Sequence, residues 1–292
     1  MLKTLIKRNV KLFFKDKGMF LTSLITPVIL LVLYTTFLGN VYRDAFTATL
    51  PEGVSITKKL LDGLVGGQLV SSLLAVSCVT VAFCSNFLMV QDKAVGTIKD
   101  LRIAPVKAAT LSLSYYIASL MSTLLICLTA TAICLGYLAL TGWYLSITDV
   151  LCLALDVVLL VLFGTALSSV INLFLTSQGQ ISAVGTVVSS GYGFVCGAYM
   201  PISSFSPGLQ KAISFLPGTY GTVLMRNHAM QSALAELEKL GIPIKEIKDA
   251  IDCNLYFFET SVSIPAMYAV LVITIAVLIA LYIFLNIHKK SH

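Results

Sequence analysis

The chain has 292 residues, of which 57% are hydrophobic and only 12% are charged. A soluble domain would carry roughly twice that share of charged residues, which excludes an ordinary soluble protein. The apolar residues gather in runs of about 20, the length that crosses a bilayer as a helix, so we predict an all-α polytopic membrane protein. We interpret the net charge of +6 as a signal of topology and expect no nucleic-acid partner.

Residues 1–17 are predicted to form a helix that lies on the membrane surface. Lysines recur every four residues along one side of this helix, and apolar residues gather along the other side. The lysines are Lys3, Lys7, Lys11 and Lys15. A basic face opposite an apolar face suits a helix in the headgroup plane. A plain basic flank of the first span would need only the lysines, so the apolar side favours the surface helix.

Six apolar runs are long enough to be transmembrane helices. They cover residues 19–38, 64–90, 111–140, 150–175, 181–200 and 264–287. An even number of spans places both ends of the chain on the same side of the membrane. Pro27 lies inside the first run, where a membrane helix tolerates a proline.

The charged stretch at 92–107 predicts a short helix between the second and third runs. Leu101 lies on an apolar edge of this helix, whereas Lys99 and Arg102 lie on a basic edge. Pro105 ends the helix, because the residue before a proline is pushed out of the helical region. Such an element needs a partner for its exposed face.

Positive charge is distributed unevenly between the two sides. The side with both termini and the stretch at 92–107 has twelve lysines and arginines and only three acidic residues. The other side has eight, and acidic neighbours accompany them. Lysine and arginine favour cytoplasmic loops. We therefore expect a multi-pass protein of the cell membrane with both termini in the cytoplasm.

Small residues recur every four positions in the fifth run. They are Gly185, Ser189, Gly193 and Gly197. This spacing places them in one stripe along a helix, where small side chains let two helix backbones approach closely. We predict that the stripe forms a dimer interface. Packing against another helix of the same chain is the open alternative.

The long connection at 201–263 is predicted to lie outside the membrane and to begin with a hairpin of two short apolar helices. Proline favours the first position of a helix, and a Pro-Gly break separates the two helices. This pattern fits a re-entrant hairpin, and the residues that carry it are Pro207, Pro217, Gly218 and Arg226. Residues 232–252 are more polar and predict an exposed helical insertion that is broken at 241–243.

No catalytic or metal-binding constellation is found in the sequence. None of the three histidines stands at a metal-ligand spacing, and no nucleotide-binding glycine loop occurs. We therefore predict no catalytic residue, no metal and no bound cofactor on this chain. Asp156 is the one acidic residue placed inside a span, which makes it a candidate functional group. A shallow position in contact with interfacial water is the alternative that we favour.

Two segments resemble one family of membrane proteins. GTIKDLRIAPVK at 96–107 resembles the first cytoplasmic loop of ABC-2 type permeases, the membrane subunits of one class of ABC exporter. FLPGTYGTVLMR at 215–226 is similar to the proline-led re-entrant hairpin of that family, which ends in arginine. Members more often have Asn-Pro-Leu-Thr where this chain has Leu-Pro-Gly-Thr. The resemblance extends over nearly the whole chain through the order of the spans.

The resemblance implies a single transmembrane domain that dimerises and docks two cytosolic ATPase subunits. Those subunits would bind the ATP and Mg, and membrane lipids would surround the permease. The coupling helix of the family corresponds to about Val95–Ile103 and its interface helix to residues 1–17. The residues expected to couple to the ATPase are Gly96, Thr97, Lys99, Leu101, Arg102 and Pro105. The dimer is expected to be a homodimer, with a heterodimer as the alternative.

The sequence therefore favours the permease subunit of an ATP-driven exporter of an amphiphile. The cargo would be a drug, an antimicrobial or a lipid-like compound, as in multidrug efflux. An exporter of lipid-linked polysaccharide is the first alternative. A membrane-embedded lipid-modifying enzyme with Asp156 or His228 as its working group is a more remote one, and a sensor whose external region binds a ligand is another.

Overall fold

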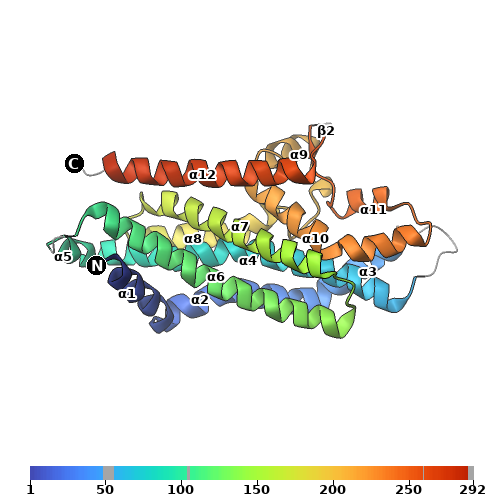
Figure 1. The fold of residues 1–292 in the computed structure, drawn as a ribbon, viewed down its shortest axis with the longest axis horizontal. Coiled ribbons are helices and arrows are strands. Elements are labelled where there is room, and N and C mark those ends of the chain that lie inside the picture. The colour runs from blue at the N-terminus through green and yellow to red at the C-terminus, as the bar shows by residue number, and fades with distance from the viewer. Residues whose placement is uncertain (49–55, 104–105, 259, 289–292) are drawn as a thin grey trace.

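The computed structural model describes residues 1–48, 56–103, 106–258 and 260–288, which form a long helical bundle (Figure 1). In chain order the elements are α1 (Leu2–Lys15), α2 (Lys17–Leu33), a π-helical turn (Tyr34–Leu38), α3 (Gly39–Ala48), α4 (Lys58–Val95), α5 (Thr97–Ile103), α6 (Ala108–Thr141), α7 (Ile147–Asn172), α8 (Gln178–Val195), a 3-10 turn (Ile202–Ser204), α9 (Pro207–Ile213), α10 (Pro217–Lys239), α11 (Ile244–Ala250), β1 (Tyr256–Phe257), β2 (Thr260–Ser261) and α12 (Ile264–His288).

Five helices in the described part of the chain are long and apolar enough to cross a membrane. They are the continuous helix Lys17–Ala48 and the helices α4, α6, α7 and α12. This confirms the prediction of an all-α polytopic membrane protein. α8 covers most of the predicted span at 181–200, but its glutamines, serines and glycines leave it without an 18-residue stretch as apolar as those of the other five. Length and composition therefore do not reproduce the predicted count of six.

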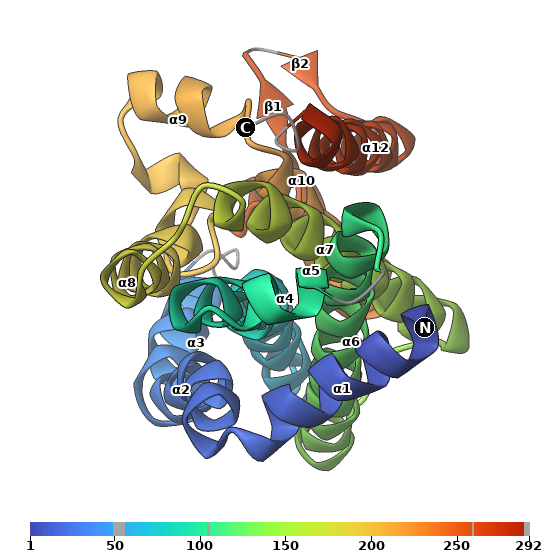
Figure 2. The same cartoon turned by 90° about the vertical axis from the view of Figure 1, so that its left-hand side faces the viewer.

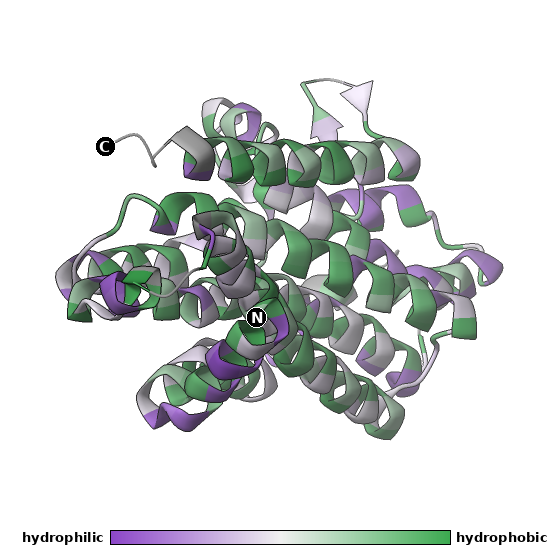
Figure 3. Ribbon diagram, turned by 60° about the vertical axis from the view of Figure 1, so that its left-hand side comes forward, coloured by the Kyte–Doolittle hydropathy of each residue, from purple (hydrophilic) through white to green (hydrophobic). Residues whose placement is uncertain are grey.

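α4 is the central helix of the bundle. Its most apolar stretch is buried throughout, and α2, α6, α7, α8 and α10 pack around it (Figure 2). Glycines allow these close approaches, because a Cβ on Gly67 would meet the carbonyl oxygen of Ala229 at 2.7 Å. Hydrophobic residues predominate along the long helices, while hydrophilic residues gather along α1 and at the ends of the bundle (Figure 3).

α1 is a helix with the two faces predicted for it. Leu5, Asn9 and Phe13 are buried, and they face α6, which α1 crosses (Figure 2). The four lysines spaced by four residues are exposed. Asp16 ends α1 and caps α2, because its side chain accepts a hydrogen bond from the Met19 N–H at 3.0 Å.

The connection between α8 and α12 contains more structure than predicted. The helical breaks lie at 214–216 and 240–243, next to the predicted breaks at Pro217-Gly218 and at 241–243. Pro217 and Gly218 are the first residues of α10, which continues without interruption into the predicted insertion and ends at Lys239. α11 forms the rest of the insertion. A two-stranded antiparallel hairpin of β1 and β2, which was not predicted, leads into α12.

The bundle has two distinct ends. The N-terminal end of α1, the helix α5 and the C-terminal end of α12 lie at one end (Figure 1). The second half of α10, together with α11, lies towards the other (Figure 1). The start of α1 and the last described residues of α12 therefore lie at the same end of the bundle, as the even number of predicted spans requires.

Candidate functional site: the α5 surface and the groove between α2 and α8

A sharp turn at Gly96 separates α5 from α4. Gly96 has a φ of +90°, in the left-handed region that glycine enters without steric cost. Nothing lies within 4 Å of the position that a Cβ would take, so the requirement for glycine is conformational. The Gly96 N–H donates to the Lys93 carbonyl at 3.2 Å and closes the end of α4. The chain then begins α5 at Thr97, two residues after the predicted start of this helix, and ends it at Ile103.

α5 turns one side to the bundle and the other outward. Ile98 and Leu101 are partly buried against the core, whereas Lys99 is exposed. Two apolar side chains that the sequence did not single out, Val95 and Ile103, are 78% and 84% exposed. The α5 surface, defined by Val95, Lys99 and Ile103, thus combines apolar and basic groups. Two residues predicted for this surface fall outside the described atoms: Pro105, and the side chain of Arg102.

Lys93 ties the base of α5 to the end of α7. Its Nζ donates to the carbonyl oxygens of Asn172, Leu173 and Leu175 at 2.9, 3.3 and 3.4 Å. The last carbonyls of a helix lack partners within the helix, and a cation there also complements the helix dipole. Lys93 therefore links the end of α4, just before α5, to the end of α7.

Asp92 ties the same base to α1 and α6. One of its carboxylate oxygens accepts hydrogen bonds from Arg8 Nη1 at 2.8 Å and from the Tyr115 hydroxyl at 2.5 Å. Asn9, the polar residue on the apolar side of α1, donates to Ser114 on α6 at 3.3 Å. Charge-assisted hydrogen bonds of this kind are stronger than neutral ones. α1, α4 and α6 are therefore held as one unit behind α5.

A groove of about 710 Å³ lies between α2 and α8, with α4 behind it. Its walls combine hydroxyl side chains with apolar ones, among them Thr22, Thr26, Thr186, Ser190, Ile25, Ile29 and Phe87. Thr22 and Ser190 donate their hydroxyl protons to carbonyls one turn earlier in their own helices, at 2.6 Å each. Such bonding leaves the oxygen atoms free to accept. The groove therefore offers an apolar surface with hydrogen-bond acceptors.

Two tyrosine hydroxyls link α8 and the end of α2 to the turn that follows α8. Tyr199 lines the groove, and its hydroxyl donates to the Ser189 carbonyl at 3.4 Å. Tyr34, in the π-helical turn after α2, donates to the Ala198 carbonyl at 3.4 Å. A π-helical turn inside an α-helix often accompanies a functional site. Here it joins the end of α2 to the turn that follows α8.

The four small residues of the predicted stripe have different surroundings. Gly185 and Ser189 border the groove. Gly193 is buried, and a Cβ there would collide with the ring of Tyr199. Gly197 lies beyond the end of α8 with a φ of +74°, so it does not continue the helical stripe. Contacts inside the chain thus account for Gly193, while the dimer interface stays a prediction.

Two of the predicted hairpin residues are prolines that begin α9 and α10. Pro207 and Pro217 are the first residues of these two helices, where the missing N–H of proline costs no helical hydrogen bond. Gly218 packs so closely on Tyr192 that a Cβ would collide with the tyrosine hydroxyl. α10 then packs against α4 and α7.

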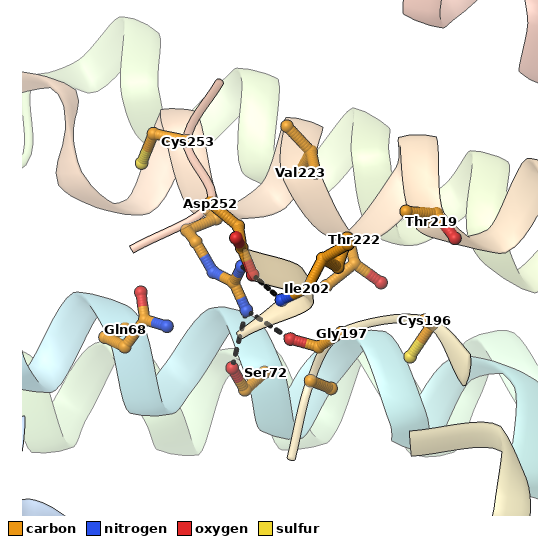
Figure 4. Close-up of polar contacts among 12 residues, drawn as sticks. Gln68, Ser72, Cys196, Gly197, Ile202, Thr219, Thr222, Val223, Asp252 and Cys253 are labelled. Carbon is orange, nitrogen blue, oxygen red and sulfur yellow. Dashed lines mark hydrogen bonds and ion pairs between the residues drawn. The ribbon is translucent and has the colours of Figure 1, made fainter. Parts of the chain in front are cut away.

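Arg226 is buried in a polar cluster that joins α4, α10 and the turn after α8. Figure 4 shows its partners Ser72, Gly197 and Asp252. Arg226 is 1% exposed, and its Nη2 donates to the Gly197 carbonyl at 2.8 Å and to Ser72 at 3.3 Å. Its Nη1 lies 3.4 Å from Asp252, which also accepts from the Ile202 N–H at 2.6 Å. Burial raises the pKa of the Asp252 carboxyl, and Arg226 offsets part of that rise. The cluster holds the turn after α8 against α4 and α10.

Asp156 does not have the shallow, hydrated position that we favoured. It is 1% exposed and accepts hydrogen bonds from the Tyr268 hydroxyl at 2.7 Å, while its other oxygen lies 2.6 Å from His228 Nδ1. The sequence singled out Asp156 and His228 separately, but only the packing of α7, α10 and α12 brings them together. In the part of the chain that the structure describes, no group of three metal-ligating side chains was found.

The residues that sequence reasoning missed are those whose role depends on a distant partner. Tyr115 and Ser72 lie in apolar runs with no local signal of function. Val95 and Ile103 could have been found, since both are apolar residues inside a charged loop. Asp252 could not have been found in this way, because it lies in a turn after α11 and its partner Arg226 belongs to α10.

The fold and the site together define a polytopic membrane protein with a groove along its spans and an exposed helix at one end. A family model described as ABC-2 type transporter matches residues 1–230, which is more than half of the chain. The chain therefore belongs to the ABC-2 type transporter family, and it is a membrane permease component of an ABC transporter. A search of curated proteins gives no match.

Proposed function

We propose that this permease is the transmembrane subunit of an ATP-driven exporter and that cytosolic ATPase subunits dock on the α5 surface. The observation that carries the proposal is the exposure of Val95, at the end of α4, and of Lys99 and Ile103 on α5. They lie next to the bonds that join α4 to α1, α6 and α7. Apolar residues at 78% and 84% exposure favour a protein partner. ATP and Mg bind to that partner, and this chain hydrolyses no ATP.

The orientation follows from charge. Residues 1–17, the stretch at 92–107 and the sequence after α12 together have twelve lysines and arginines, against eight in the two loops predicted on the other side. Basic residues in short loops favour the cytoplasm. Both termini and the α5 surface are therefore cytoplasmic in this proposal, where an ATPase can reach them.

The bonds at the base of α5 provide a route for mechanical coupling. An ATPase that closes on nucleotide pushes α5, and Lys93 passes the displacement to the end of α7. Asp92 passes it to α1 through Arg8 and to α6 through Tyr115. Because these are short bonds between packed helices, the spans move as connected bodies, and the groove between α2 and α8 changes shape.

The groove accommodates an amphiphilic substrate. Its apolar residues suit a hydrocarbon portion, and its hydroxyl oxygens suit polar hydrogens of the cargo. A second copy of the permease packs against the exposed faces of α2 and α8, where Ile25, Val28 and Val187 are 52%, 53% and 69% exposed. Gly185 and Ser189 then lie at the seam of the dimer. Two permeases and two ATPases make up the complete exporter.

Charge reversal at α5 tests the docking. The variant Lys99→Glu/Arg102→Glu is expected to lose co-purification with the ABC ATPase subunit co-expressed with it, because Lys99 lies on the docking face and the sequence predicts Arg102 on the same basic edge. Lys58→Glu is the matched control, since Lys58 is an exposed lysine at the opposite end of α4. Unchanged co-purification of the charge-reversed variant, with both proteins folded, would refute docking at α5.

Direction and substrate need a transport assay. Proteoliposomes with the permease and its ATPase are expected to move a fluorescent amphiphile away from the side where ATP is added and hydrolysed. Transport by the permease alone, or movement towards the ATP side, would contradict an ATP-driven exporter. A Lys99→Cys variant that reacts with a membrane-impermeant maleimide on intact cells would contradict the orientation.

A further inference from the structure

Three phenylalanine side chains form an exposed cluster beside the start of α12. Phe257 ends β1, Phe258 follows it, and Phe215 lies between α9 and α10. The ring centroids of Phe215 and Phe257 are 5.1 Å apart, and that of Phe258 is 6.0 Å from the first and 5.0 Å from the second. Phe215, Phe257 and Phe258 are 61%, 37% and 51% exposed. Grouped exposed apolar side chains mark an interaction surface.

The turn of the hairpin has a bulky residue where a small one is usual. Phe257 pairs with Thr260, so Phe258 is the first residue of a two-residue loop. Its φ is +56°, in the left-handed region where loops of this length favour asparagine, aspartate or glycine. A phenylalanine with such a φ is strained. Strained residues of this kind gather at functional sites, which indicates that the Phe258 ring serves a contact outside the turn.

The hairpin has a polar side as well as an aromatic one. Neighbouring residues of a strand point to opposite faces. Phe257 joins the phenylalanine cluster, whereas the Tyr256 hydroxyl donates to Asp249 Oδ1 at 2.9 Å. Asn254 donates to the same oxygen at 2.7 Å, and all three of these polar residues line a cavity of about 460 Å³. An aromatic side next to a polar side suits the border between lipid and water.

The phenylalanine cluster lies at the border of a membrane span. β2 ends at Ser261, and only Val262 and Ser263 separate it from α12. The apolar stretch of α12 begins at once, at Ile264. Figure 1 shows the hairpin beside the first turn of α12. Aromatic residues are enriched where spans enter and leave the bilayer.

Position and charge favour lipid over a second copy of the chain. Figure 2 shows the hairpin and α12 on the side of the bundle away from α1 and α2, so the dimer seam proposed at α2 lies elsewhere. Lys211 on α9 is exposed, and its Nζ lies 5.6 Å from the centre of the Phe258 ring. A lysine at a membrane border lays its stem on apolar surface and keeps its charge among the headgroups.

We propose that Phe215, Phe257 and Phe258 insert into the interface of the phospholipid bilayer where α12 enters it, with Lys211 beside the lipid phosphates. This anchor fixes the hairpin and the junction of α9 and α10 to the membrane surface. The leaflet, which is the outer one, rests on the orientation proposed above. Insertion itself requires neither docking of an ATPase nor transport, so its loss and the loss of export are separate results.

Depth-dependent fluorescence quenching tests the insertion, because Trp143 is the single tryptophan. In a Trp143→Phe background, Phe215→Trp places a reporter in the phenylalanine cluster. Leu240→Trp is the matched control for water, since Leu240 is 59% exposed directly after α10. Ile273→Trp is the control for lipid, at 63% exposure within α12. The full-length permease is placed in phosphatidylcholine nanodiscs with lipid brominated either near the headgroup or near the chain end, and iodide is the aqueous quencher.

The three reporters are expected to differ in which quencher reaches them. Phe215→Trp should be quenched more by bromine near the headgroup than by bromine near the chain end, and Ile273→Trp should show the opposite order. Leu240→Trp should be quenched by iodide alone. If Phe215→Trp behaves like Leu240→Trp, the cluster faces water and the proposal is overturned. If it follows Ile273→Trp, the cluster is buried in hydrocarbon, and the interfacial position is overturned.

Two substitutions test the individual contacts in the Phe215→Trp background. Phe258→Gly removes the ring, and glycine adopts a φ of +56° without strain, so the fold is retained. It is expected to increase iodide quenching of the reporter. Lys211→Gln is expected to reduce quenching by headgroup bromine when the nanodiscs contain anionic phosphatidylglycerol, while Lys245→Gln, which changes an exposed lysine of α11, is not. A reporter that responds to neither Phe258→Gly nor Lys211→Gln would refute the roles given to these two residues.

Discussion

Replacing Ile103 by asparagine tests whether the exposed apolar residues of α5 contact the ATPase. Complete burial of an isoleucine side chain contributes about 1.5–3 kcal/mol. Ile103 is 84% exposed in the permease alone, so nearly all of that contribution is still available to a partner. If docking covers this side chain, Ile103→Asn forfeits about 2 kcal/mol of binding free energy. That loss corresponds to a Kd about 30-fold higher.

The assay measures binding of the purified ABC ATPase subunit to the permease in nanodiscs by biolayer interferometry. Ile147→Asn is the matched control, because Ile147 is 82% exposed at the start of α7, at the opposite end of the bundle. It is expected to leave the Kd unchanged. Equal affinities for wild type and Ile103→Asn, or equal weakening by both variants, would refute the reasoning.

Three further substitutions probe the supports of the site. Asp92→Ala removes the acceptor of two hydrogen bonds and is expected to lower the free energy of unfolding by about 2 kcal/mol, measured by thermal denaturation in detergent. Gly96→Ala places a Cβ at a φ of +90° and costs about 1–2 kcal/mol, so trypsin is expected to cleave the α4–α5 junction faster than in Gly179→Ala, which has no such φ. Asp252→Leu leaves a buried guanidinium unpaired and is expected to cost about 3–5 kcal/mol, whereas adding Arg226→Met removes that charge and restores most of the loss.

Each of these expectations has a clear contrary result. An unchanged melting temperature for Asp92→Ala would mean that α1 is held mainly by its apolar face. Equal trypsin sensitivity of the two glycine variants would mean that the α4–α5 junction is not strained by a side chain. A double variant no more stable than Asp252→Leu alone would mean that the unpaired charge is not the cause of the loss.

The predictions that hold are those set by local chemistry. Apolar runs identify the helices that are long enough to span a membrane, and the four-residue spacing of lysines identifies the exposed side of α1. Pro217 starts a helix because its ring fixes φ and its missing N–H is not needed there. The short helix at α5 follows from the charged stretch between two apolar runs.

Boundaries were predicted less well, because hydropathy marks the edge of the membrane and not the end of a helix. α4 begins at Lys58, six residues before the predicted span, since its polar first turns remain helical outside the apolar region. α10 continues to Lys239 through polar sequence for the same reason. The hairpin of β1 and β2 has strands of two residues, too short to leave a periodic pattern.

The sequence by itself determined that the chain is a helical membrane protein with a charged helix between two spans, because side-chain hydropathy and spacing act within a few turns of one helix. Only the tertiary structure decided which polar groups meet. Asp92 joins Arg8 across 84 positions of sequence, and Asp156 meets His228 across 72. Such pairs depend on which helices lie side by side and at what rotation. That arrangement is set by close packing around α4, where glycines such as Gly67 admit a neighbouring backbone, and no short stretch of sequence records it.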